Sequence, residues 1–102
     1  TELSDKYLRQ ALQYYSGEPE VHYLASIINI MKGDLKNAEM QIRIAIEIKS
    51  DFEKAYELLS QILYMQERYN DVIDISDYLI SRNRNNSNAW YVKGIAQNKL
   101  GL

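Results

Sequence analysis

The sequence has no cysteine, one histidine, one proline and only four glycines. The lack of cysteine excludes disulfides, thiolate catalysis and thiolate-ligated zinc. No apolar run approaches the roughly 20 residues that a helix needs to span a bilayer, and no signal-like apolar segment opens the chain. The formal net charge of −2 provides no basic surplus to attract phosphate backbones or anionic lipids. We therefore expect no membrane insertion and no nucleic-acid binding.

Between the few breakers, apolar residues recur three and four positions apart. Over 35–48 they fall on one helical face, while Lys36, Glu39 and Arg43 occupy the other, which predicts an amphipathic helix. No segment shows the sustained alternation that is typical of strands. The sequence thus predicts an all-α fold of about six helices, over 2–16, 19–32, 35–48, 53–66, 69–82 and 87–100.

The connections between these segments contain the residues that begin and end helices. Gly33 is suited to a left-handed helix end, and Asp34 can cap the following helix with its side chain. Gly17 and Pro19 place glycine after one helix and proline in the first turn of the next. Turns of two to four residues join helices of about fourteen residues, which predicts stacked antiparallel pairs.

The chain aligns with itself from end to end without insertion when position 19 is placed on position 53, and position 53 on position 87. We call this spacing the repeat interval. Small residues recur at positions where two helix backbones approach closely, and large ones recur where gaps between helix pairs need filling. The aligned sets are Ala11, Ala45 and Leu79; His22, Tyr56 and Trp90; Ser26, Ser60 and Gly94; and Gly33, Glu67 and Gly101.

These residues resemble the tetratricopeptide repeat. The stretch 90–94 followed by Lys99-Leu100-Gly101 is similar to the family's opening helix, and Gly33-Asp34-Leu35 with Ala38, Ile42 and Ala45 is similar to its second helix. The resemblance implies a right-handed α-solenoid and a single array over 1–102. Its parts are a second-helix half repeat (1–18), two complete repeats (19–52 and 53–86) and a first-helix half repeat (87–102).

Some positions depart from the family pattern. The proline near the repeat end is missing, and Lys93 and Gln97 occupy positions where leucine and a large aromatic are usual. The last segment therefore fits either a capping helix or a truncated repeat. We favour truncation and expect the chain to be a fragment of a longer protein.

The sequence contains few residue patterns that indicate catalysis or metal binding. His22 stands at a packing position of the repeat, so we expect a structural role for it. Asp71, Asp74 and Asp77 share one helix face, which offers too few converging oxygens for calcium. No phosphate-binding glycine loop and no nucleophile with a base at matching spacing occur. We expect no enzyme activity, no cofactor and no metal.

The resemblance also implies which residues line the concave face of the solenoid. Each first helix contributes six positions, and the resulting groove is apolar and aromatic, with two methionines. This composition suits an amphipathic or extended apolar segment of a partner, because methionine adapts to varied anchors. The predicted peptide-binding residues are Tyr23, Ile27, Met31, Tyr64, Met65, Tyr91 and Ile95, with rim charges at Glu20, Lys54, Glu57 and Lys99.

One branch of the family clamps C-terminal carboxylates with lysine, arginine and asparagine in the groove. The corresponding places here hold Tyr23, Ile27, Leu58, Asn88 and Val92, so binding of such a terminus is not expected. We therefore expect a scaffold for a protein or peptide partner. Some of these residues, Leu24 and Leu58 above all, equally fit packing between neighbouring helices.

Two alternatives remain open at this point. The chain begins with the second-helix half of a repeat (1–18) and ends with the first-helix half (87–102). The end of one copy and the start of another therefore make up a whole repeat, which is compatible with head-to-tail self-association into filaments. It also fits a recruiting arm of a larger enzyme, an idea that rests on the family's habit of fusion alone. Neither the cytoplasm, which we favour, nor the periplasm is excluded.

Overall fold

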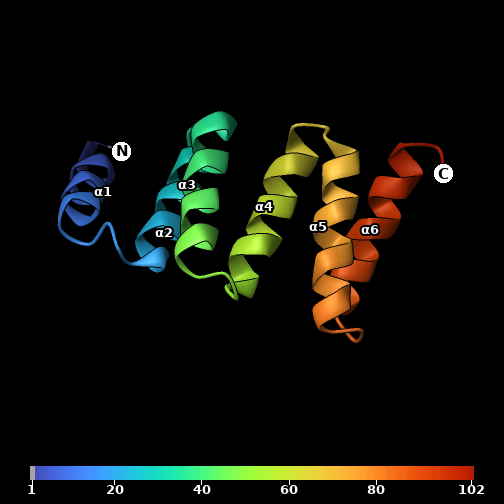
Figure 1. The fold of residues 1–102 in the computed structure, drawn as a ribbon. Helices are drawn as coiled ribbons and strands as arrows, with labels where there is room; N and C mark the ends of the chain where they lie inside the picture. The colour runs from blue at the N-terminus through green and yellow to red at the C-terminus, as the bar shows by residue number, and fades with distance from the viewer. Residues whose placement is uncertain (1) are drawn as a thin grey trace. The chain divides into compact units, whose positions relative to one another are not determined.

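The computed structural model describes residues 2–102, without the side chain of Ser4. Thr1, where the first predicted half repeat begins, lies outside the described residues. The fold is all-α, and the described part contains no strand. Figure 1 shows its six helices, which are α1 (Glu2–Tyr14), α2 (Pro19–Met31), α3 (Leu35–Ile48), α4 (Glu53–Met65), α5 (Tyr69–Arg82) and α6 (Ser87–Lys99).

The predicted helices are confirmed, with every end at or close to its predicted position. Asp34 caps α3 by accepting a hydrogen bond from the backbone N–H of Asn37 at 3.2 Å, and Asn86 caps α6 by accepting one from Ala89 at 3.1 Å. Pro19 stands in the first turn of α2, where its missing N–H costs nothing. Local sequence chemistry therefore accounts for the starts of α2, α3 and α6.

The turns that close α2, α4 and α6 share one geometry and follow one another at the repeat interval. Gly33, Glu67 and Gly101 have φ of 77°, 60° and 78°. Each donates its N–H to the carbonyl three positions earlier, at 2.9, 3.0 and 3.1 Å. The residue after each donates to the carbonyl five positions before it, at 2.8, 2.9 and 2.9 Å. This pair of bonds is the Schellman motif, and it recurs in all three turns.

The turns that follow α1, α3 and α5 share a second geometry. The N–H groups of Tyr15, Lys49 and Asn83 donate to the carbonyl four positions earlier, at 2.7, 3.0 and 3.0 Å. Three positions further on, the N–H donates back to the carbonyl of each of these residues, at 2.9, 3.1 and 3.1 Å. The two turn types therefore alternate along the chain, and each recurs at the repeat interval of the sequence.

The chain divides into two compact units, and the division falls within α4, between Ala55 and Tyr56. In the first unit, α2 and α3 form an antiparallel pair. His22 lies beside Gln41 and Ser26 beside Ala38, so residues further along α2 meet residues nearer the start of α3. Small side chains are almost completely buried in this pair and allow its close approach. They are Ala25 and Ser26 on α2, and Ala38 and Ala45 on α3.

His22 is buried in the first unit, as its predicted structural role requires. Its Nε2–H donates to the carbonyl oxygen of Ser16 at 2.7 Å, and its Nδ1 lies 2.8 Å from the side-chain amide of Gln41. Both ring nitrogens are thus engaged, and the ring connects α2 with the preceding turn and with α3.

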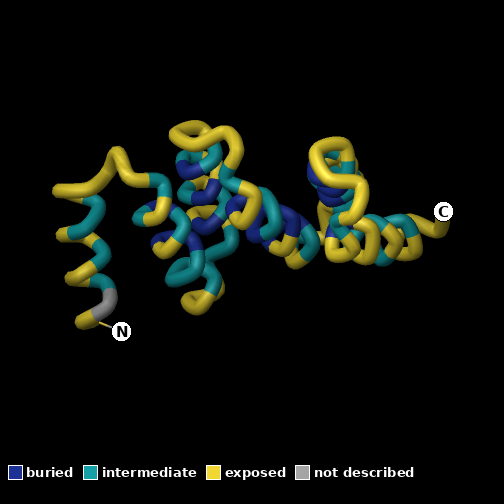
Figure 2. Tube along the Cα trace, turned by 90° about the horizontal axis from the view of Figure 1, so that it is seen from below, coloured by how far each residue is buried: buried dark blue, intermediate teal, exposed yellow. Residues whose placement is uncertain are grey.

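Helix α1 contributes no buried residue among those described, whereas α2 and α3 contribute several (Figure 2). An ion pair joins Asp5 of α1 to Lys32, which follows α2. The Lys32 ammonium beside Asp5 holds the pKa of that carboxyl below its usual value. This polar contact supplements the apolar contacts between α1 and α2.

The second unit contains an antiparallel pair of α4 and α5. Tyr64 packs edge-on against Tyr69 near the connecting turn, with ring centroids 5.4 Å apart. Tyr56 packs against Tyr78 at the far end, at 4.7 Å. Burial of the Tyr56 phenol raises its pKa, and its interaction with Tyr78 adds to this rise. The core of the unit includes Leu59, Ile62, Leu63, Val72, Leu79, Ala89 and Ala96.

Helix α6 completes the second unit beside α5. Lys93 forms an ion pair with Asp77 of α5 at 2.6 Å, and its Nζ lies 5.6 Å from the centre of the Trp90 ring. The interpretation of Trp90 as a gap-filling core residue is wrong, because half of its surface is exposed. Its indole N–H instead donates to the carbonyl of Arg84 at 2.9 Å, along the connection between α5 and α6.

Candidate functional site

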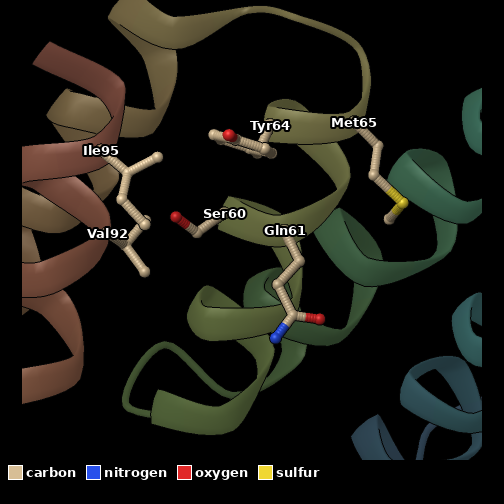
Figure 3. A pocket seen from close by; sticks show the side chains of 6 residues that line it. All are labelled: Ser60, Gln61, Tyr64, Met65, Val92 and Ile95. Atoms are coloured by element: carbon tan, nitrogen blue, oxygen red, sulfur yellow. The ribbon is translucent and has the colours of Figure 1, made fainter. Parts of the chain in front are cut away.

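An apolar concavity of the second unit lies between α4 and α6. Its volume is about 310 Å³, and Figure 3 shows the side chains that line it. Three of the predicted peptide-binding residues, Tyr64, Met65 and Ile95, line this pocket together with Ser60, Gln61 and Val92. We call it the α4–α6 pocket. The structure thus brings three of the seven predicted peptide-binding residues together here.

Helical spacing explains which side chains enter the pocket. Ser60 and Tyr64, and likewise Gln61 and Met65, are four positions apart on α4, so each pair lies on one helix face. Val92 and Ile95 are three apart on α6 and face them (Figure 3). The ring of Tyr64 is held in place by its contact with Tyr69 of α5. The side chains that line the pocket are therefore positioned by α4 and α6, and the Tyr64 ring is also packed against α5.

The floor of the pocket contains an unusual hydroxyl. Ser60 is only 4% exposed, and its Oγ has no hydrogen-bond partner among the described residues. In Figure 3 this oxygen points toward Val92 and Ile95. Ser26, which stands one repeat interval earlier, instead donates its hydroxyl to the carbonyl of Ala38 at 2.7 Å. The two equivalent serines thus differ in hydrogen bonding.

A smaller pocket, which we call the polar pocket because most of its lining residues are polar, adjoins the first. It shares Ser60, Gln61 and Val92 with the α4–α6 pocket and has a volume of about 30 Å³. Its polar lining includes Glu57, one of the predicted rim charges, and Asn88 of α6. The surface between α4 and α6 therefore changes from apolar at Tyr64 and Ile95 to polar at Glu57.

In the first unit, a wider pocket of about 530 Å³ contains three further predicted residues, Tyr23, Glu20 and Lys54. The Tyr23 ring lies 5.5 Å from the ring of Phe52, and the Lys49 ammonium lies 5.2 Å from the centre of the latter. The sequence analysis did not single out Phe52 or Lys49, because both fall in the connection before α4, for which the repeat pattern supplies no binding position.

Four predicted residues line none of these pockets. Ile27 is half-buried and Met31 is 80% exposed on α2, and Tyr91 is 69% exposed on α6, which also carries the exposed Lys99. Ile27 follows Tyr23 by four positions and precedes Met31 by four, so all three share one face of α2.

Another apolar pocket was not predicted. It lies between α1 and α2 in the first unit, has a volume of about 300 Å³ and is lined by Tyr7, Leu8, Ala11, Val21, Leu24 and Ile28. Leu24 lines it and remains 56% exposed, whereas Leu58, at the same repeat position, is buried. The packing interpretation thus fits Leu58 and not Leu24.

Several charged groups of the second unit pair with one another. Asp71 accepts a hydrogen bond from Arg68 at 3.0 Å, and Asp77 binds Lys93. Among residues 2–102, no three His, Asp or Glu side chains are placed to hold a metal ion. No helix in this part of the chain combines the length and the apolar character needed to cross a membrane. The arrangement offers apolar and hydrogen-bonding contacts to a ligand.

No protein-family model matches the chain, and no curated protein matches its sequence. The resemblance to tetratricopeptide repeats therefore rests on the repeat interval and on the residues that recur at it.

Proposed function

We propose that this chain is a tetratricopeptide-like interaction module that binds an apolar segment of another protein. The observation that supports it is the α4–α6 pocket, where Tyr64, Met65 and Ile95 meet on an open, apolar surface. Stacking of the helix pairs into a right-handed solenoid, with the first helices on the concave side, is part of the same proposal.

The pocket has the properties of an anchor site. Burying one leucine- or isoleucine-sized side chain contributes roughly 1.5–3 kcal/mol, so a single anchor gives weak binding that neighbouring contacts must reinforce. The flexible thioether of Met65, 45% exposed, can adapt to different anchors. Tyr23, Ile27 and Met31 offer a second apolar surface on α2, in the first unit.

A pull-down from lysate of the source cells tests this proposal, with bound proteins identified by mass spectrometry. The wild-type chain is compared with Ile95→Glu and Tyr64→Glu, which place a carboxylate in the apolar pocket. A carboxylate loses hydration there without gaining a partner, so we expect a specific partner to be lost by both variants.

The matched control is Tyr14→Glu, which changes an exposed tyrosine that lines none of the pockets described above. We expect this variant to retain the partner, and all variants to keep the wild-type helical circular dichroism. Equal recovery of partners by wild type and by both pocket variants would show that the α4–α6 pocket is not the binding surface.

A further inference from the structure

The charge distribution around the α4–α6 pocket indicates what kind of segment it accepts. We propose that it selects segments carrying a lysine or arginine near an uncharged aliphatic residue, with Glu57 binding the cation and Tyr64 and Ile95 binding the aliphatic side chain. This inference rests on the proposed function and specifies the partner's chemistry.

The two pockets between α4 and α6 provide one continuous surface for such a segment. They share Ser60, Gln61 and Val92, so a ligand that fills the apolar pocket reaches the polar one without crossing a helix. The apolar pocket has no charged lining residue among those described. Within it, a partner charge of either sign would lose hydration without compensation.

Glu57 is the single charged residue, of those described, that lines the polar pocket. Within residues 2–102, its carboxylate takes part in no ion pair or side-chain hydrogen bond. Four other charged side chains of the second unit are engaged in two pairs, Lys93 with Asp77 and Arg68 with Asp71. The surface thus presents one half-buried, uncompensated negative charge, which attracts a cation and repels an acidic segment.

Ser60 stands where the two pockets meet. Its buried hydroxyl lacks a partner within the described part of the chain, whereas that of the equivalent Ser26 is bonded to a carbonyl. A hydroxyl both donates and accepts, so a small rotation about its side-chain bond lets it pair with a main-chain group of an occupant. The surface thus offers Glu57 to a cationic side chain, Ser60 to a main-chain group, and Tyr64 and Ile95 to an aliphatic side chain. A peptide presents the same three kinds of group when a main-chain polar group lies between its cationic and aliphatic side chains.

The helix geometry sets the spacing between the two partner residues. Glu57 precedes Gln61 by four positions and Tyr64 by seven, which corresponds to about 6–10 Å along α4 at a rise of about 1.5 Å per residue. A helical partner covers this distance in about four to seven residues, and an extended one in two to three at about 3.3 Å each. The basic and aliphatic residues should therefore recur at one of these spacings.

The experiment is a phage-display selection of random peptides on the full chain, each about 16 residues long (a length of roughly 24 Å if helical, which exceeds the distance needed). An enriched sequence is then synthesised with blocked ends, and its affinity is measured by fluorescence anisotropy. Binding is compared for wild type, Glu57→Gln, Ile95→Glu and the control Glu47→Gln, which removes an exposed carboxylate of α3.

We expect enriched peptides to carry lysine or arginine at the stated spacing from leucine, isoleucine or methionine. Glu57→Gln should weaken binding about two- to fivefold, the range for a partly exposed ion pair. Replacing the peptide's basic residue by glutamine should have the same effect, and both changes together little more than either. Glu47→Gln should leave affinity unchanged.

The two hypotheses fail in different ways. Peptides that need Ile95 but show no basic residue, contain acidic ones, or ignore Glu57→Gln overturn the charge selectivity and leave the proposed function standing. Absence of any enriched peptide, or peptides that bind Ile95→Glu as well as wild type, overturns both. Circular dichroism of each variant excludes unfolding as the cause.

Discussion

Glu67 adopts the left-handed backbone conformation that Gly33 adopts one repeat interval earlier, with φ of 60° and 77°. Both residues donate their N–H to the carbonyl three positions back, and the next residue closes the same Schellman motif. The two positions therefore share their backbone geometry as well as their place in the repeat. Glutamate has a Cβ that this conformation disfavours, and glycine does not.

The first prediction is that Glu67→Gly stabilises the protein. The left-handed conformation costs a non-glycine residue roughly 1–2 kcal/mol, and part of the gain is offset by the greater freedom of glycine in the unfolded chain. We expect the free energy of unfolding, measured by urea denaturation, to increase by about 0.5–1 kcal/mol. Gly33→Ala is the reverse control and should destabilise by about 1 kcal/mol. An unchanged or lowered stability of Glu67→Gly would contradict the observed turn.

The helices were predictable because their signals are local. The apolar period, the capping residue Asp34 and the first-turn residue Pro19 act within a few residues, and each has the role that the sequence assigns to it. The left-handed glycine at position 33 belongs to the same group. Glu67 shows the limit of such signals, because no property of glutamate indicates a left-handed turn and only its alignment with glycines does.

The residues of the proposed binding surface were predictable only in part. The repeat register supplied Tyr64, Met65 and Ile95, since positions on one helix face follow from spacing. It did not indicate the role of Ser60, because a small residue at a packing position gives no sign of which way its hydroxyl points. Trp90 was misinterpreted for a related reason. Its alignment with His22 suggested burial, whereas its indole N–H bonds the Arg84 carbonyl at the surface.

The second prediction concerns the stability of the protein at low pH. The pKa of Asp5 lies below its usual value of 3.8 because of Lys32, so the ion pair contributes stability at neutral pH and loses it as pH falls through the lowered pKa. Asp5→Asn should therefore lower the melting temperature at neutral pH, and the difference from wild type should vanish well below pH 3.8. Asp74→Asn, which removes an exposed carboxylate of α5, is the control. A difference that persists unchanged in acid would exclude an electrostatic origin.

The third prediction concerns the stability of the protein at high pH. Burial, with Tyr78 as a further cause, raises the pKa of Tyr56 above its usual value of 10.0. The folded state favours the neutral phenol, so its contribution to stability is complete below pH 10.0 and falls as pH rises through the raised pKa. Tyr56→Phe should reduce the alkaline loss of stability, measured as the shift of the urea midpoint with pH. The control Tyr7→Phe, at an exposed position on α1, should lose stability as wild type does.

The fourth prediction compares the two equivalent serines. Ser26→Ala removes a buried hydrogen bond to Ala38, whose net contribution is about 1 kcal/mol, partly offset by the better helix propensity of alanine. Ser60→Ala removes a buried hydroxyl that has no partner among the described residues and gains the same propensity, so it should be neutral or stabilising by up to about 1 kcal/mol.

The contrast between these two variants is the informative quantity, because both remove one oxygen from a buried position on a first helix of the repeat. Urea denaturation of the free protein should therefore rank Ser60→Ala at or above wild type and wild type above Ser26→Ala. Equal losses in both variants would mean that Ser60 is bonded in the free protein, which would remove its role at the junction of the two pockets. If Ser60→Ala stabilises the free chain yet weakens the selected peptide, the hydroxyl serves binding at a cost to stability, the trade-off common in binding sites.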